Sequence, residues 1–237
     1  GEIWDVSFSP DSKWITYSRM ESNDFNVIYV FNLADKKEYP VTDRWYTSSN
    51  PVFSKDGKYL IFTSARDFNP MYGSKEWNHI YQASNGVYMA LLAKDTPSPF
   101  LEKDAKTRVL EKEETAKIEE KDHGTVQIDT DGITDRILKL PLSPAYYWNF
   151  YSDGSKVYYT KTGSSFVFDL KTQKEESVAE GASMFVSFHD KKALFLKNSQ
   201  IYVTNIPTGK ADLKDAVNLS NMKINTDYPL EWAQIFD

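Results

Sequence analysis

Hydrophobic and polar residues alternate along most of this chain in short segments that are bounded by turn-forming residues. Residues 13–18 and 26–33 are two such segments, and a weaker segment at 38–42 contains Pro40. Strict alternation over four to eight residues is typical of β-strands that bury one face, and proline suits a strand at the edge of a sheet. The pattern therefore predicts an all-β chain with short antiparallel strands.

One phrase recurs at the start of each group of strands. It consists of an aromatic residue, a polar turn such as Ser-Pro-Asp-Ser, a lysine and an alternating strand, and it is found at 8–17, 53–62, 150–159 and, in a degraded form, 188–196. Repeats of about 40–50 residues built in this way are typical of β-propellers, in which each repeat forms one four-stranded blade. We expect about four blades, at approximately 1–43, 44–130, 131–179 and 180–222. Closed propellers usually have more than four blades, so we expect part of a larger ring, with blades that come from elsewhere as the alternative. The open sheets of a four-blade arc predict either self-association or an unusually small closed ring.

Two segments interrupt the repeat. Residues 66–79 lie between the second and third strands of the second predicted blade and are unusually aromatic for a connection. Residues 102–121 are rich in lysine and glutamate and predict a solvated insertion, to which we assign no function. Functional residues are often found on loops that a rigid scaffold positions. The first interruption is therefore the better candidate for a binding surface.

The candidate binding residues all come from this first loop. Aromatic and arginine side chains dominate binding hot spots, which favours a rim surface that contacts a peptide or a neighbouring domain. The alternative is structural: Tyr72 and Trp77 would cover the sheet edge, and Arg66 and Asp67 would form an internal ion pair. The candidates are Arg66, Asp67, Asn69, Trp77, Asn78 and His79. We expect the tryptophans at 4, 14, 45 and 148 to pack between blades.

Composition excludes several classes of function. The net charge is −6 and no basic stripe is present, which argues against a nucleic-acid partner. No apolar run is long enough to span a bilayer, and we expect neither a membrane partner nor a signal peptide at the start. Cysteine is absent, so thiol nucleophiles and cysteine metal sites are excluded. We expect the chain, which begins at Gly1, to be a processed product or a fragment.

No segment predicts a catalytic centre, a metal site or a cofactor. The carboxylates between Asp129 and Asp135 resemble a calcium loop, but an EF-hand needs glycine at its sixth position and glutamate at its twelfth. Here glycine is fourth, at Gly132, and the twelfth residue is Leu140. We expect a structural turn between blades there, in which Asp131 or Asp135 pairs with Arg136 or caps backbone amides. None of the three histidines lies in a nucleophile motif such as Gly-x-Ser-x-Gly.

Several segments resemble the tricorn protease family, specifically the propeller that precedes its catalytic half. They are 45–54, 63–70, 76–79, 92–100, the Asp-Gly-Ile phrase within 128–141, and 231–237, which resembles the opening of the helical region that follows the propeller. The resemblance covers nearly the whole chain. It implies that 223–237 are a linker or the start of that region, and that the catalytic residues of a serine peptidase lie beyond Asp237.

The resemblance favours one function and leaves another open. We expect a non-catalytic propeller segment that gates or guides peptides to a catalytic domain outside this chain. Its partners would be peptides and that domain, in the cytoplasm by resemblance or, alternatively, in an exported protein. The alternative function is a TolB-like propeller scaffold for protein–protein interaction that has no peptidase activity.

Overall fold

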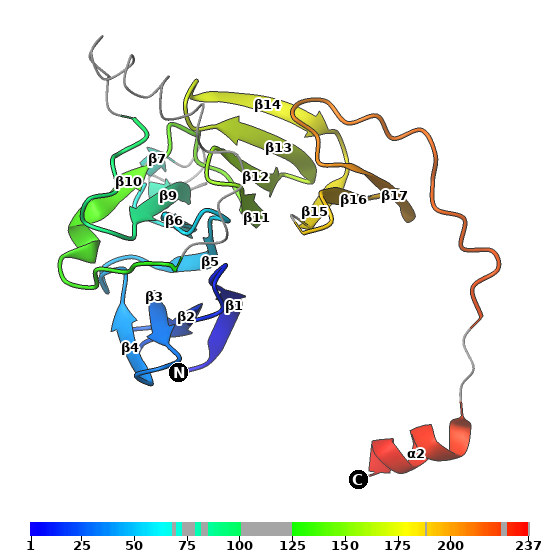
Figure 1. The fold of residues 1–237 in the computed structure, drawn as a ribbon, viewed down its shortest axis with the longest axis horizontal. Helices are drawn as coiled ribbons and strands as arrows, with labels where there is room; N and C mark the ends of the chain where they lie inside the picture. The colour runs from blue at the N-terminus through cyan, green and yellow to red at the C-terminus, as the bar shows by residue number, and fades with distance from the viewer. Residues whose placement is uncertain are drawn as a thin grey trace.

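The computed structural model is an arc of antiparallel sheets (Figure 1). It describes residues 1–67, 70–72, 79–81, 85–100, 125–187, 189–223 and 227–236. Within these residues the chain is nearly all β, and its four main sheets follow one another in sequence order, as the blades of a propeller do. The prediction of an all-β propeller arrangement is confirmed.

Three of the main sheets have four strands. The first sheet contains β1 (Ile3–Phe8), β2 (Trp14–Met20), β3 (Asn26–Asn32) and β4 (Lys37–Pro40). The second contains β5 (Ser48–Phe53), β6 (Tyr59–Ser64), β9 (Gly86–Leu91) and β10 (Ile137–Lys139). The third contains β11 (Tyr147–Ser152), β12 (Lys156–Lys161), β13 (Ser164–Asp169) and β14 (Lys174–Ala179).

The remaining elements are shorter or stand outside the repeat. The fourth sheet contains β15 (Ser183–Ser187), β16 (Lys192–Lys197) and β17 (Gln200–Asn205). A small hairpin joins β7 (Pro70–Tyr72) and β8 (His79–Tyr81), and a 3₁₀ turn, η1, covers Ile133–Arg136. The helix α2 (Tyr228–Phe236) comes last. None of the helices in the described ranges is long and apolar enough to cross a membrane.

Two features of the blades differ from the sequence prediction. The outer strand of the second sheet is β10, which lies beyond the boundary expected at 130, because the insertion separates β9 from its partner strand. The fourth sheet has three strands instead of four, and a single bridge from Tyr202 to Ala216 takes the place of an outer strand. The repeat phrase marks the start of each blade but does not show where its outer strand lies.

The recurring serine and aspartate close the turn between the first two strands of a blade. The Ser9 hydroxyl accepts a hydrogen bond from the Trp14 amide at 2.9 Å and donates one to Asp11 at 2.6 Å. Ser54 makes the same pair of bonds one repeat later. The phrase recurs because each serine satisfies a backbone amide that the tight turn would otherwise leave unpaired.

Apolar side chains fill the spaces between neighbouring sheets. Successive residues of a strand point to opposite faces, so Leu60 packs toward the first sheet and Ile61 toward the third, and both are fully buried. The other two interior faces are filled in the same way, with Tyr159 and Phe168 on one side of the third sheet and Tyr158 and Val167 on the other. Each of the two middle sheets is therefore apolar on both faces.

The first and fourth sheets each leave one face open. On the fourth sheet the open face carries Phe185, Leu196 and Val203, which are 41–50% exposed. On the first sheet the exposed apolar residues are Ile3, Trp4, Val6 and Phe8 from β1 and Met20 from β2. The open face of the fourth sheet is apolar across all three of its strands, whereas much of the open face of the first sheet is covered by charged groups.

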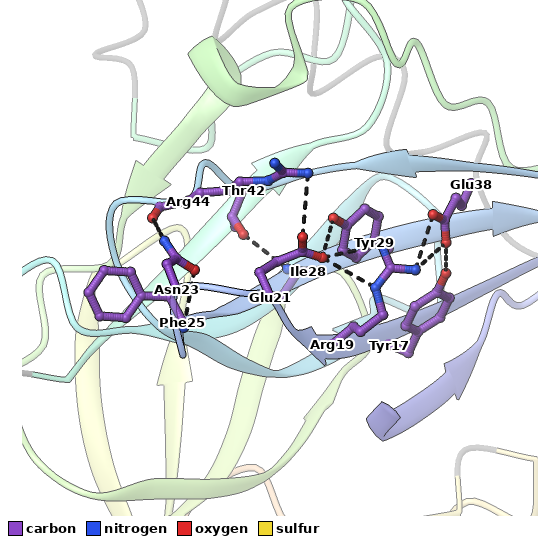
Figure 2. A network of polar contacts seen from close by, with 10 residues as sticks. All are labelled: Tyr17, Arg19, Glu21, Asn23, Phe25, Ile28, Tyr29, Glu38, Thr42 and Arg44. Atoms are coloured by element: carbon purple, nitrogen blue, oxygen red, sulfur yellow. Dashed lines mark hydrogen bonds and ion pairs between the residues drawn. The ribbon is translucent and has the colours of Figure 1, made fainter. Parts of the chain in front are cut away.

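Figure 2 shows the charged groups that cover the open face of the first sheet. Arg19 bonds Glu38 at 2.8 Å and Glu21 at 3.2 Å, and its guanidinium lies 4.2 Å from the centre of the Tyr29 ring. The hydroxyls of Tyr17 and Tyr29 donate to Glu38 and Glu21 at 2.5 and 2.8 Å. We call these five residues the polar clasp. It joins strands β2, β3 and β4 over a face against which no other sheet of the described residues packs.

Replacing a side chain between the two middle sheets should be costly. Ile61→Ala should lower the free energy of unfolding by about 2–5 kcal/mol, the range measured for cavities in closely packed cores. Leu196→Ala is the control, because Leu196 is also on the middle strand of its sheet but faces outward. Denaturant unfolding checks this, and equal losses in the two variants would contradict the assignment of the interior faces.

The polar clasp should make stability depend on acidity. The hydroxyl of Tyr29 lowers the pKa of Glu21 below its ordinary 4.5, and Tyr17, followed by Arg19, does the same for Glu38. A carboxyl whose pKa is lowered by folding stabilises the protein above its unfolded pKa, and this contribution is lost as the pH falls through the folded value. Stability should therefore decrease as the pH falls below about 4.5.

The double variant Tyr17→Phe/Tyr29→Phe removes both hydroxyls, so its stability should fall less between about pH 6 and pH 3. Thermal melts across this range measure the difference. Tyr202→Phe is the control, because its hydroxyl donates to Gln200 and to no carboxylate. An unchanged pH profile in the double variant would refute the role of the clasp.

Candidate functional site

The predicted site residues lie beyond the end of β6 as far as the structure describes them. Arg66 and Asp67 follow β6 after a single residue, Ala65, and His79 is the first residue of β8. Asn69, Trp77 and Asn78 lie outside the described residues. The structure therefore positions the side chains of two of the six candidates.

The Arg66 side chain is held between two aromatic rings and one carboxylate. Its guanidinium donates to Asp43 at 3.1 Å, and its central carbon lies 5.9 Å and 5.8 Å from the ring centres of Tyr46 and Tyr88. A guanidinium within about 6 Å of an aromatic ring is attracted to the π electrons. Arg66 therefore connects the segment before β5 with strand β9.

Asp67 has a different set of partners. It accepts hydrogen bonds from the Tyr88 hydroxyl at 3.2 Å and from the Lys139 ammonium at 2.5 Å. The internal ion pair expected between Arg66 and Asp67 is therefore replaced by two separate pairs, Arg66 with Asp43 and Asp67 with Lys139. Burial, followed by the negative charge of Asp67, raises the pKa of Tyr88 to about 12, so this hydroxyl stays protonated at neutral pH and acts as a donor.

Gly86 allows Asp67 to come this close to β9. A Cβ atom at position 86 would lie 2.4 Å from the Asp67 carboxylate, well inside the closest contact that side chains make. A larger residue at the start of β9 would therefore displace Asp67 from both of its partners. The glycine is required by this close approach.

Three exposed aromatic side chains come from the connections that lead into β5 and β11, and one of them, Tyr46, lies next to Arg66. Trp45 is 78% exposed and Tyr46 is 43% exposed, and both lie in the connection that leads into β5. Tyr146, which is 69% exposed, lies at the equivalent place before β11. We define the blade-two rim as Trp45, Tyr46, Arg66, Asp67 and Tyr146. It combines exposed ring faces with a cation and a carboxylate that are held in fixed positions.

Sequence reasoning missed part of this rim. The prediction that Trp45 packs between blades is wrong, because its side chain is largely exposed to solvent. Trp4 is also exposed, at 52%. Trp14 is buried, as predicted. Trp45 and Tyr46 stand in the polar stretch 43–50, ahead of an alternating strand. That position in a connection was the signal that could have identified them as surface residues.

The acidic phrase at 129–135 is structural, as expected. Gly132 has φ +68° and begins the turn η1. Arg136 donates to the backbone carbonyls of Leu91, Asp129 and Asp131, while Asp131 pairs with Lys94 at 3.0 Å. Arg136 thus binds carbonyls and not a carboxylate, and it fastens β10 to the end of β9. Among the described residues, no group of three or more histidine and acidic side chains could hold a metal ion.

Comparison with known proteins identifies the family. Residues 1–206 match the family described as the tricorn protease second beta propeller domain. This chain belongs to that family. The resemblance expected from the sequence is therefore confirmed.

Curated relatives and a solved structure carry the tricorn name. The chain is 26% identical to "Tricorn protease homolog 1" of Streptomyces coelicolor over 264 residues, which covers 100% of this chain and 25% of that protein. It is 27% identical to the "Putative Tricorn-like protease C-terminal subunit" of Sulfurisphaera tokodaii, covering 99% of this chain and 28% of that one. The crystal structure of the tricorn protease shares the fold, with a TM-score of 0.66 and 18% identity over 86% of this chain and 21% of that chain. The chain thus spans about a quarter of the length of each of these proteins.

The close approach at Gly86 can be tested in this tricorn-family propeller. Gly86→Ala should lower the free energy of unfolding by about 1–3 kcal/mol, because it separates the Asp67 carboxylate, whose side chain is only 13% exposed, from Tyr88 and Lys139. Gly209→Ala is a matched control, since its nearest neighbour is the mobile end of Glu176 at 3.2 Å. Chemical unfolding compares the two, and a Gly86→Ala variant as stable as the control would contradict this geometry.

Proposed function

We propose that this chain is a non-catalytic part of a tricorn-like serine peptidase and that it guides peptides to a catalytic domain outside residues 1–237. The family match supports the peptidase context, because the curated relatives are named as tricorn proteases. The sequence contributes no nucleophile motif to such a reaction. Its contribution would be to bind and direct the substrate.

The observation that carries the proposal is the blade-two rim. Trp45 and Tyr146 expose ring faces to solvent, and Arg66 is fixed beneath Tyr46 by its bond to Asp43. Rigid aromatic side chains and arginine contribute most to recognition surfaces, because they offer large contact areas at a low cost in conformational entropy. A rim of this kind suits weak contacts with peptides of varied sequence.

The arc supports a guiding role through its shape. The innermost strands of the four sheets line its concave side, and the packing between sheets holds them in fixed positions (Figure 1). The two open faces would be covered by other parts of the intact protein, since this chain spans about a quarter of its relatives. A ring completed in this way would offer a peptide a passage with fixed walls.

The proposal predicts a dependence on substrate length in the intact peptidase. Trp45→Ala/Tyr146→Ala should raise KM for peptides of about ten or more residues several-fold, because two aromatic contacts are lost. The same variant should leave kcat/KM for a short fluorogenic substrate unchanged, because a short substrate does not span the distance from rim to active site. Steady-state kinetics on the two substrate classes measures this.

Tyr39→Ala/Tyr202→Ala is the control, since Tyr39 lies on β4 and Tyr202 on β17, each the last strand of its sheet and not an innermost one. Equal effects on long and short peptides would indicate a structural defect. No effect on either class would leave the interaction scaffold as the better account of the rim.

A further inference from the structure

The innermost strands of three successive sheets share one irregularity. Strands β1, β5 and β11 lie on the concave side of the arc and contact one another in order (Figure 1). In each, the pairing with the next strand shifts by one residue at the same place. The shifts fall between Trp4 and Ser7, between Ser49 and Val52, and between Trp148 and Tyr151.

Each of these β-bulges contains an aspartate or asparagine with a left-handed backbone. The residues are Asp5, Asn50 and Asn149, with φ of 55°, 56° and 53°. Asparagine and aspartate adopt this conformation more readily than other residues that carry a side chain. A bulge interrupts the regular spacing of donors and acceptors along a strand edge, so a passing extended chain cannot pair with it as a continuous ladder.

The first two bulges use their side chains inside the protein. The Asp5 carboxylate accepts hydrogen bonds from the Ser18 hydroxyl at 3.1 Å and from the backbone N–H of Asn50 at 3.0 Å. The second bond links the first sheet to the second. Asn50 donates to the Thr63 hydroxyl at 3.4 Å. Ser18 and Thr63 stand opposite Trp4 and Ser49 in the two sheets, so their positions are equivalent.

The third bulge lacks these internal bonds. Thr160, which stands opposite Trp148, is the residue equivalent to Ser18 and Thr63. Its hydroxyl is fully buried and finds no partner among the described residues, and the half-buried Asn149 carboxamide makes no hydrogen bond within that same part of the chain. A buried hydroxyl without a partner costs free energy, so native structures seldom leave one without a reason.

We propose that the bulge at Asn149 is a binding point for the main chain of an extended peptide on the concave side of the arc. The proposal rests on the proposed function, because it requires peptides to pass along this surface. Asn149 can turn inward to Thr160, as Asn50 does to Thr63, or outward to a ligand. Asn50 would have to give up its bond to Thr63 before it could bind a ligand, whereas Asn149 has no such internal bond to lose among the described residues.

The chemistry of the carboxamide defines the ligand class. It carries one acceptor oxygen and two N–H donors, which match the N–H and C=O groups of a peptide unit. Such recognition does not depend on the peptide's side chains. The bulge prevents a longer ladder from forming next to it, so the contact is limited to one or two hydrogen bonds and the peptide is released readily. A surface along which peptides move needs weak contacts of this kind, because each contact must release the peptide again.

The test compares two glycine variants of this chain. Glycine adopts a left-handed backbone without strain, so Asn149→Gly removes the carboxamide and keeps the bulge, whereas alanine would strain it. Asn50→Gly is the matched control at the equivalent bulge. The probe is a peptide of about 12 residues of alanine, glycine and serine, which is titrated into ¹⁵N-labelled protein. An extended peptide of this length, at about 3.3 Å per residue, can pass several strands. Its backbone N-methylated counterpart, which lacks N–H donors, is the second probe.

We expect the peptide to shift the Asn149 side-chain resonance. Asn149→Gly should weaken binding about tenfold, the loss expected for one or two hydrogen bonds, while Asn50→Gly should change it little. The N-methylated peptide should bind more weakly to the unmodified protein and equally to Asn149→Gly. Equal affinity of the two glycine variants for the first peptide would overturn the assignment. Melting temperatures confirm that both variants fold.

The outcome separates this inference from the proposed function. Shifts at Trp45 and Tyr146 without a shift at Asn149 would retain the rim as the peptide contact and reject the bulge. The absence of shifts at either place at millimolar peptide would reject both. Shifts at Asn149 alone would support the bulge and reject the rim.

Discussion

Packing of one apolar sheet face against the next is the interaction on which the rest of this structure depends. In the middle sheets, alternate residues of a strand belong to different cores, as Leu60 and Ile61 do, so each sheet is fixed by both of its neighbours. A single blade cannot bury its own apolar faces, so it depends on stacking against its neighbours. The arc is therefore a cooperative stack. The innermost strands owe their fixed positions to side chains that lie behind them, between the sheets.

This constraint decides where polar chemistry can occur. The interiors between sheets have little room for charged groups, so the charged residues gather at the ends of strands and on the open face of the first sheet. At the end of β6, two ion pairs and two aromatic rings hold Arg66 and Asp67 in place. On the open face, both carboxylates of the polar clasp, Glu21 and Glu38, form ion pairs with Arg19. Both arrangements are rigid because the sheets beneath them are rigid.

The sequence predicted the features that depend on local chemistry. The serine and aspartate of the repeat phrase act within their own turn, as the bonds of Ser9 and Asp11 show, so a short pattern was enough to predict the fold. The family resemblance came from other segments, such as 92–100 and 128–141. The partners of Arg66 and Asp67 could not be predicted, because Asp43 and Lys139 come from segments far apart in the chain. The outer strand β10 was missed for the same reason, since a long insertion separates it from β9. The exposure of Trp45 depends on what packs beside a connection, and an aromatic residue near a strand looks the same in sequence whether it is buried or not.

The central claim is that peptides contact this propeller along its rim and concave side. The most direct test is photo-crosslinking in the intact peptidase, with a peptide substrate that carries a benzophenone side chain and with mass spectrometry to locate the attachment sites. The account predicts crosslinks at Trp45, Tyr146 and the residues of β5 and β11 that adjoin their bulges. Crosslinks confined to the outer strands β4, β10 and β14 would contradict it, because those strands lie on the convex side of the arc (Figure 1).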